Sequence, residues 1–246
     1  MKKTTIQVGY RGFRDVNDEI KRNLETVNEI VLTDVFGQRY IGDGMPAGKT
    51  LTIKGTPGND MGAYMDGGHI EVFGNGQDAV GNTMNGGRII IHGSTGDALG
   101  YAMRDGEIYV EGDVGYRCGI HMKEFQNARP VIVIGGSAGS FMGEYMAGGI
   151  IILLGRGALP GKLVGNYLAT GIHGGSIYVR GEVPAHCMTP AVVSTPCPDE
   201  DFKKISGYVK NYCKFFGADP DELLKDAFVK LRAISNRPFK SMYTGN

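Results

Sequence analysis

The sequence predicts an all-β solenoid, a right-handed parallel β-helix with a single strand in each coil, and three observations support this prediction. The first is an internal repeat of 19 residues between Gly55 and Gly112. Three successive units read GAYMDGGHIEVFGNGQDAV (62–80), GNTMNGGRIIIHGSTGDAL (81–99) and GYAMRDGEIYVEGDVGYRC (100–118). A unit of this size cannot bury its own apolar face, so it must stack on its neighbours.

The second observation is one short strand per unit, followed by a glycine. The glycines that set the register are Gly55, Gly74, Gly93, Gly112, Gly135, Gly155 and Gly181. The residues two and four positions before each of them are aliphatic, and side chains alternate across a strand, so these pairs are predicted to face the interior. The pairs are Leu51 and Ile53, Ile70 and Val72, Ile89 and Ile91, Ile108 and Val110, Val131 and Val133, Ile151 and Leu153, and Ile177 and Val179.

The third observation is a set of further columns with the same period, combined with the absence of helical periodicity over residues 42–181. Methionine recurs nine residues before the glycine at Met65, Met84, Met103 and Met146. Six residues after the glycine stand Met61, Val80, Leu99 and Cys118. We interpret both columns as core, because flexible thioethers fill irregular interior space far more often than they bind soft metals. Seven strands predict a column of about seven coils, on the order of 30 Å long.

The first segment of the chain, residues 1–40, is expected to carry a short helix that packs on the solenoid. The stretch DVNDEIKRNLETVN has Asp15 or Asn17 as a candidate N-cap and places Ile20, Leu24 and Val27 on one face. The solenoid itself is predicted for residues 41–183.

The last segment, residues 184–246, is expected to form a proline-rich linker and a helical tail. A first helix in PDEDFKKISGYVKNYCKFFG ends at Gly217 and carries Phe202, Ile205, Val209, Tyr212 and Phe216 at helical spacing. A second helix, after Asp219 and Pro220, is predicted in DELLKDAFVKLRA with Leu224, Ala227, Phe228 and Leu231 inward. Outward strand positions predicted at Ile132, Ile134, Ile150, Ile152 and Leu154 are apolar, and we expect these helices, or a partner, to cover them.

Composition excludes several function classes. The 246 residues contain 26 basic and 26 acidic side chains, so charge gives no argument for binding nucleic acid or an anionic membrane. The N-terminal stretch has no apolar signal region and no run of 18 apolar residues follows, which predicts a cytoplasmic protein. The four cysteines, at 118, 187, 197 and 213, form no CxxC pair, and a reducing cytosol argues against a bridge between Cys187 and Cys197.

No motif predicts catalytic, cofactor-binding or metal-binding residues in this chain. AGKT at 47–50 resembles the end of a phosphate-binding loop, but its register aligns Thr50 with His69 at the start of a strand instead of a helix. The glycine-rich stretches 74–81 and 155–161 do not open a helix and are interpreted as turns. The histidines, at 69, 92, 121, 173 and 186, are scattered along the chain.

The coil between Gly112 and Gly135 breaks the period and is four residues longer than the repeat. It carries the charged residues Arg117, His121, Lys123, Glu124 and Arg129. Insertions in solenoids project from one face and often form the binding surface. These five residues are therefore the candidate partner interface.

The repeated G-x-x-M-x-G-G-x-I-x-V-x-G pattern, with GDVGYRCGIHMKE and GNYLATGIHGGSIYVRG, resembles the GXGXG domain at the C-terminal end of the large subunit of glutamate synthase. The resemblance runs from about residue 15 to about residue 183, and the tail ending in NRPFKSMYTGN resembles a stand-alone form of that domain. The same repeat is similar to that of a structural subunit of formylmethanofuran dehydrogenase.

The glutamate synthase resemblance implies a noncatalytic structural subunit of a complex that makes glutamate from glutamine and 2-oxoglutarate. Its partners would be a glutamine amidotransferase subunit and an FMN-binding subunit with an iron–sulfur cluster. This chain matches neither of those parts and so is expected to bind no cofactor itself. Two alternatives stay open, which are a structural subunit of a formylmethanofuran dehydrogenase-like complex and a free-standing β-helix enzyme or binding module. Self-association of the chain is also left open.

Overall fold

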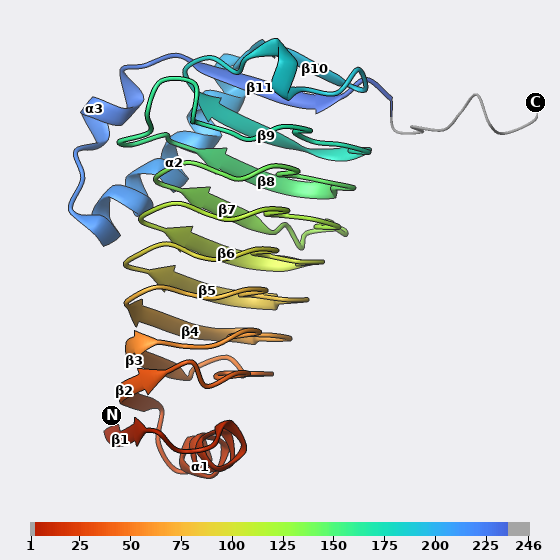
Figure 1. Cartoon of the computed structure of the whole chain (residues 1–246). Coiled ribbons are helices and arrows are strands. Elements are labelled where there is room, and N and C mark those ends of the chain that lie inside the picture. Colours follow the sequence, from red (N-terminus) through yellow and green to blue (C-terminus); the bar gives the residue numbers. More distant parts are fainter. Residues whose placement is uncertain (1–2, 236–246) are drawn as a thin grey trace, which may run out of the picture.

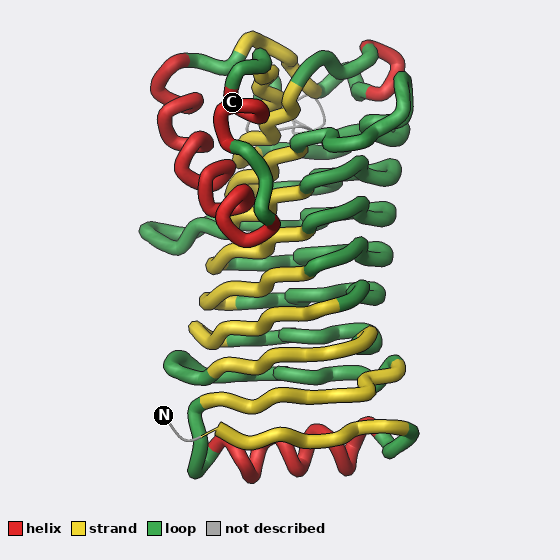
Figure 2. The backbone as a smooth tube through the Cα atoms, turned by 90° about the vertical axis from the view of Figure 1, so that its left-hand side faces the viewer, coloured by secondary structure: helices red, strands yellow, loops and turns green. Residues whose placement is uncertain are grey.

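The computed structural model describes residues 3–235, which form a column of stacked coils (Figure 1). Residues 1–2 and 236–246, including the stretch NRPFKSMYTGN, lie outside the described part. One wall of the column is a parallel sheet in which consecutive strands pair in sequence order (Figure 2). Its strands are β1 (Lys3–Gly9), β2 (Glu29–Phe36), β3 (Thr50–Thr56), β4 (Asp66–Phe73), β5 (Asn85–Ile91), β6 (Asp105–Val110), β7 (Val131–Ile134), β8 (Ala147–Leu153) and β9 (Gly174–Arg180).

The predicted parallel β-helix is confirmed, and the seven predicted strands are β3–β9. The ladder extends further toward the N-terminus than residue 41, because β1 and β2 add two more parallel strands below β3. Between them, α1 (Phe13–Leu24) lies under the open end of the core and buries Val16 and Ile20. Gly12 occupies the N-cap position of α1, so the predicted caps at Asp15 and Asn17 are wrong. Both of those residues lie inside the helix.

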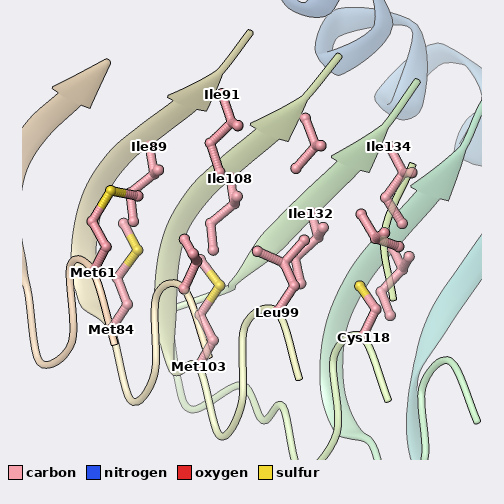
Figure 3. Close-up of a cluster of buried hydrophobic side chains, with 14 of the residues drawn as sticks. Met61, Met84, Ile89, Ile91, Leu99, Met103, Ile108, Cys118, Ile132 and Ile134 are labelled. Atoms are coloured by element: carbon pink, nitrogen blue, oxygen red, sulfur yellow. The ribbon is translucent and has the colours of Figure 1, made fainter. Parts of the chain in front are cut away.

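The interior is a continuous set of stacked aliphatic and sulfur-containing side chains (Figure 3). Both predicted columns are buried there, including Met65, Met84 and Cys118, so their interpretation as core is confirmed. Successive strands pair at equivalent repeat positions, for example Ile70 with Ile89. Each fully buried aliphatic side chain of this kind contributes about 1.5–3 kcal/mol through the hydrophobic effect.

Close stacking of the coils requires glycine after the strands. The backbone of Gly74 has a φ of 155°, and a Cβ atom there would lie 2.3 Å from the carbonyl oxygen of Gly55 in the coil below. Polar side chains add ladders at the same corner. The amide of Asp97 donates to Asp78 Oδ1 at 2.8 Å, and the amide of Tyr116 donates to Asp97 Oδ1 at the same distance. These bonds satisfy backbone donors between coils that the sheet itself does not reach.

The register predicted for β7 is wrong by one residue. Ile132 and Ile134 face the interior, while Val131 and Val133 face outward. The glycine that stacks on Gly112 is Gly136, whose amide donates to the Gly112 carbonyl at 2.9 Å.

Gly135, the residue before Gly136, has a separate reason to be glycine. A Cβ atom at this position would lie 2.0 Å from the hydroxyl oxygen of Tyr212. The coil therefore spans 24 positions between Gly112 and Gly136, five more than the regular repeat.

The outward apolar face is covered by the chain itself, through α2 (Asp199–Phe216) (Figure 1). Ile150, Ile152 and Leu154 are buried against this helix as predicted, together with Val131 and Val133 in place of the predicted Ile132 and Ile134. The helix ends at Gly217 in the left-handed conformation, which confirms the predicted end. The residues of α2 buried against the sheet are Ile205, Val209, Tyr212 and Cys213.

The second C-terminal helix is much shorter than predicted. A single turn, α3 (Pro220–Leu224), starts at the predicted cap Asp219, and the chain then forms β11 (Phe228–Ala233). This strand pairs antiparallel with β9 and with β10 (Val192–Pro196), which follows the short 3₁₀ turn η1 (Ala185–Cys187). The open edge of β9 offers a full row of backbone partners, and this pairing outweighs the local helix propensity of the segment.

Replacing Ile89 with aspartate is expected to unfold the middle of the column. The substitution places a carboxylate without a partner among fully buried side chains, at a cost of several kcal/mol. Thermal unfolding followed by circular dichroism would show a lower midpoint. Thr52→Asp, at a half-buried outward position two coils below, is the control and should change the midpoint little. A normal midpoint for Ile89→Asp would contradict the described interior.

Cys118→Val is expected to remove part of the loss of stability at high pH. Burial raises the pKa of the Cys118 thiol from 9.0 to about 12, so the folded state disfavours the thiolate. The native chain then loses stability as the pH rises above about 9, by about 1 kcal/mol per pH unit up to about 12. Valine occurs in the same column at Val80 and carries no proton. Urea titrations of both chains between pH 7 and 11 measure the difference, and parallel pH dependences would contradict the assignment.

Candidate partner interface

The enlarged coil between β6 and β7 places the five predicted interface residues in two separate groups. Arg117 and His121 lie on the turns of the coil before the additional residues begin. Glu124 and Arg129 flank a small hairpin that the additional residues form, in which Phe125 and Ala128 exchange backbone hydrogen bonds of 3.1 and 3.0 Å. Lys123 stands between the groups, and its exposed side chain has no partner in the described part of the chain. The structure therefore does not gather the five into one cluster.

The first group is part of an exposed cluster of aromatic side chains on the turns. The ring of His121 stacks on Tyr145 with a centroid distance of 5.3 Å and meets the edge of the Tyr101 ring at 6.0 Å. The guanidinium of Arg117 lies 4.8 Å from the centroid of the Phe141 ring. We call this surface the aromatic turn patch, and it comprises Tyr101, Arg117, His121, Phe141, Tyr145 and Tyr167.

Ion pairing and backbone geometry hold the patch in place. Arg117 Nε donates to Glu144 Oε2 at 3.0 Å, and the Glu144 side chain is only 11% exposed. Arg117, His121, Phe141 and Tyr145 all have positive φ angles between 50° and 64°, which fixes the direction in which their side chains leave the turn. The coils below carry small residues at the same positions. Ala98 bonds to the coil of Arg117, and Ala102 bonds to the coil of His121.

The second group lies beside a hollow of about 530 Å³ between the start of strands β4–β7 and helix α2. Its arginines are already paired. Arg88 contacts Glu107 at 2.9 Å, and Arg129 Nε donates to Glu124 Oε2 at 3.1 Å. Burial lowers the pKa of His69 on its wall, which keeps this imidazole neutral at pH 7. The described residues that line the hollow therefore offer no unpaired cation to an anionic ligand.

Sequence reasoning missed the aromatic turn patch because it looked for aromatic residues on the outward strand positions. Two of the three aromatic side chains there, Tyr109 and Tyr178, are buried beneath α2, and the third, Phe73, stacks on His92 at 4.6 Å. A usable signal was the column two residues after the turn glycines, which contains His121 after Gly119 and Tyr145 after Gly143.

The other motifs lie where the repeat predicted. Thr50 of AGKT pairs with His69, and Lys49 Nζ donates to the carbonyl of Val27 at 3.0 Å, so this lysine is part of the scaffold. Among residues 3–235, no group of three or more His, Cys, Asp or Glu side chains is placed to hold a metal ion. The four cysteines are free thiols. No helix in this range is long and apolar enough to cross a bilayer.

Comparison with known proteins agrees with the fold and extends across nearly the whole chain. The chain is 46% identical over 255 aligned positions to the uncharacterized protein MJ1350 of Methanocaldococcus jannaschii, covering 99% of this chain and 97% of that protein. A solved neighbour is a chain of the formyltransferase/hydrolase complex FhcABCD from Methylorubrum extorquens, determined with methylofuran. It superposes with a TM-score of 0.63 at 22% identity, over 81% of this chain and 71% of the neighbour, and this likeness concerns the fold.

The family model described as the GXGXG motif matches residues 14–234, from α1 to the end of the described part. This match takes in the repeat, the enlarged coil and the C-terminal elements that cover the sheet. The chain belongs to the GXGXG family.

Proposed function

We propose that this chain is a noncatalytic structural subunit that holds other subunits of a multi-subunit enzyme in a fixed arrangement. The observation that carries the proposal is the aromatic turn patch, in which Tyr101, Arg117, His121 and Tyr145 are exposed on a rigid frame. Aromatic and arginine side chains of this kind dominate the binding energy of protein interfaces. Because the turns hold them in place before binding, little conformational entropy is lost on association.

Two types of enzyme complex are candidates for the assembly. A formyltransferase/hydrolase complex, in the manner of formylmethanofuran dehydrogenase, is supported by the solved neighbour, which comes from a complex of that kind. A glutamate synthase complex is supported by the sequence resemblance of the repeat. The first has the better support, because none of the proteins compared above is described as a glutamate synthase.

The two candidates imply different partners. In a glutamate synthase complex the chain would dock a glutamine amidotransferase subunit and an FMN-binding subunit with an iron–sulfur cluster. A scaffold is useful there because free ammonia becomes ammonium in water, so the two sites must be held together and shielded from solvent. In the other type the chain would dock subunits that carry out formyl transfer and hydrolysis.

Purification of the tagged full chain from its native cells tests the proposal and separates the two types. Mass spectrometry identifies the subunits that co-purify in stoichiometric amounts, and fluorescence of the released cofactor detects FMN. An amidotransferase with a flavoprotein supports glutamate synthase, whereas formyltransferase or hydrolase chains support the other type. A chain that elutes alone at its own mass under mild conditions would contradict the structural-subunit proposal.

The triple variant Arg117→Ala, His121→Ala, Lys123→Ala is expected to bind its partners at least about tenfold more weakly, because it removes two side chains of the patch and the adjacent free lysine. The fold should survive. The Arg117–Glu144 pair is half exposed on the arginine side, so its loss costs about 1 kcal/mol or less.

The matched control is Arg22→Ala, Lys54→Ala, His186→Ala, which removes the same residue types at exposed positions elsewhere. Affinity is measured by titration of the isolated partner subunits, and folding by thermal unfolding. Equal affinities for the two triple variants would place the interface elsewhere on the column.

A further inference from the structure

The two ends of the sheet are protected differently. At the C-terminal end the last strand, β10, runs antiparallel, ends at Pro196 and is followed by Pro198, so it is a poor template for another strand. At the N-terminal end the last strand is β1, with the sequence KTTIQVG and no proline. Natural proteins usually block such an edge, because its unpaired backbone groups can bind another chain.

Nothing in the described part of the chain covers the free edge of β1. Helix α1 lies beside the strand, under the interior of the column (Figure 1). Apart from the pairing with β2, the hydrogen bonds to the backbone of β1 all lie at its last three residues, Gln7, Val8 and Gly9. The first four residues of the strand keep their edge open.

An exposed aromatic cluster stands at the end of this edge. Tyr10 is 96% exposed and Phe36 is 61% exposed, and their rings stack with centroids 5.6 Å apart. Phe13 lies next to Tyr40 at 5.9 Å. These four rings, with the intervening arginines Arg11, Arg14 and Arg39, form what we call the N-terminal cluster, and most of them line a cleft of about 230 Å³.

A buried amide fixes the shape of the cluster. The Gln38 side chain is almost fully buried, and its Nε2 donates to the carbonyls of Gly9 at 2.8 Å and Arg11 at 3.2 Å. Its Oε1 accepts from the amide of Phe36 at 2.8 Å. The turn after β1 is thereby tied to the end of β2, so the exposed rings are held in one arrangement before anything binds.

The charge of the cluster indicates what could bind. Arg11 is paired with Glu19 at 2.5 Å. Arg14 and Arg39 have no carboxylate partner in the described part of the chain, and their guanidinium groups lie 5.7 and 5.0 Å from the centre of the Phe13 ring. A guanidinium packed on a ring still presents its N–H groups to a carboxylate. The cluster therefore suits an apolar side chain with an acidic residue next to it.

We propose that the free edge of β1 receives an extended segment of a partner subunit, which adds a strand to the sheet and places an apolar and an acidic side chain on the N-terminal cluster. Backbone pairing supplies affinity in this mode of recognition, and the cluster supplies specificity. The proposal rests on the proposed function, because it requires a partner subunit.

A second copy of this chain fits the edge poorly. The strand KTTIQVG contains no acidic residue, so it cannot supply the carboxylate that the cluster lacks. Antiparallel pairing of two β1 strands would bring Lys3 of one copy beside Arg11 and Arg39 of the other. Like charges at this distance oppose association.

Amide hydrogen exchange in the purified assembly tests the strand addition. The amides of residues 4–8 are expected to exchange at least about tenfold more slowly in the assembly than in the isolated full chain, because a new strand would bond the open edge. Unchanged exchange in an intact assembly would overturn the inference and leave the proposed function standing. Protection that appears in the isolated chain as its concentration rises would overturn it in favour of a second copy.

Two variants test the cluster. Tyr10→Ala with Phe36→Ala, and separately Arg39→Glu, are each expected to weaken the affinity for the isolated partner subunit at least about tenfold. The control pair, Tyr64→Ala with Phe73→Ala, removes comparably exposed rings elsewhere on the column and should leave it unchanged. Equal affinities for test and control variants would overturn the role of the cluster. If no partner subunit is found at all, the inference and the proposed function both fall.

Discussion

The structure depends on one constraint, which is that every coil must lie in register on the coil before it. Parallel strand pairing fixes the vertical position of each coil, and the buried columns require an apolar side chain at each inward position. A coil out of register would place polar residues in the core and leave backbone groups unpaired, which costs several kcal/mol. Positions inside the stack therefore have little freedom to change. Freedom remains at the turns, at the enlarged coil and at the two ends.

The C-terminal elements show how one half of the sheet came to be buried on both faces. Strands β7 and β8 are apolar inward and outward, and α2 covers the outward side through Tyr212, whose hydroxyl donates to the Glu111 carbonyl at 3.1 Å and accepts from Arg156 at 2.8 Å. Desolvation raises the pKa of Tyr212, so this hydroxyl keeps its proton to do so. The apolar outward strip is thus an internal contact, and it leaves the turns as the surface for partners.

Most of the fold could be predicted from the sequence because the period carries it, and the errors have local physical causes. Six of the seven predicted strands have the right register, since a single glycine follows each of them. The error at β7 arose from the pair Gly135 and Gly136, where the first glycine serves the contact with Tyr212. Met142 stands six residues after Gly136, and this column would have identified the correct glycine. For β11 and the aromatic turn patch, no pattern within one coil shows the neighbour that decides the outcome.

A rigid column with binding surfaces at two heights can set the distance between two partners. The aromatic turn patch lies on the coils that carry β6–β9, whereas the N-terminal cluster lies at the first strand pair. Between β1 and β7 there are six strand spacings of about 4.8 Å, or a separation on the order of 30 Å. A flexible linker of this span would allow the partners to move relative to each other, but stacked coils cannot shorten or bend without breaking their register. The same stacking that leaves the core no freedom is what suits this chain to hold two subunits apart at a fixed distance.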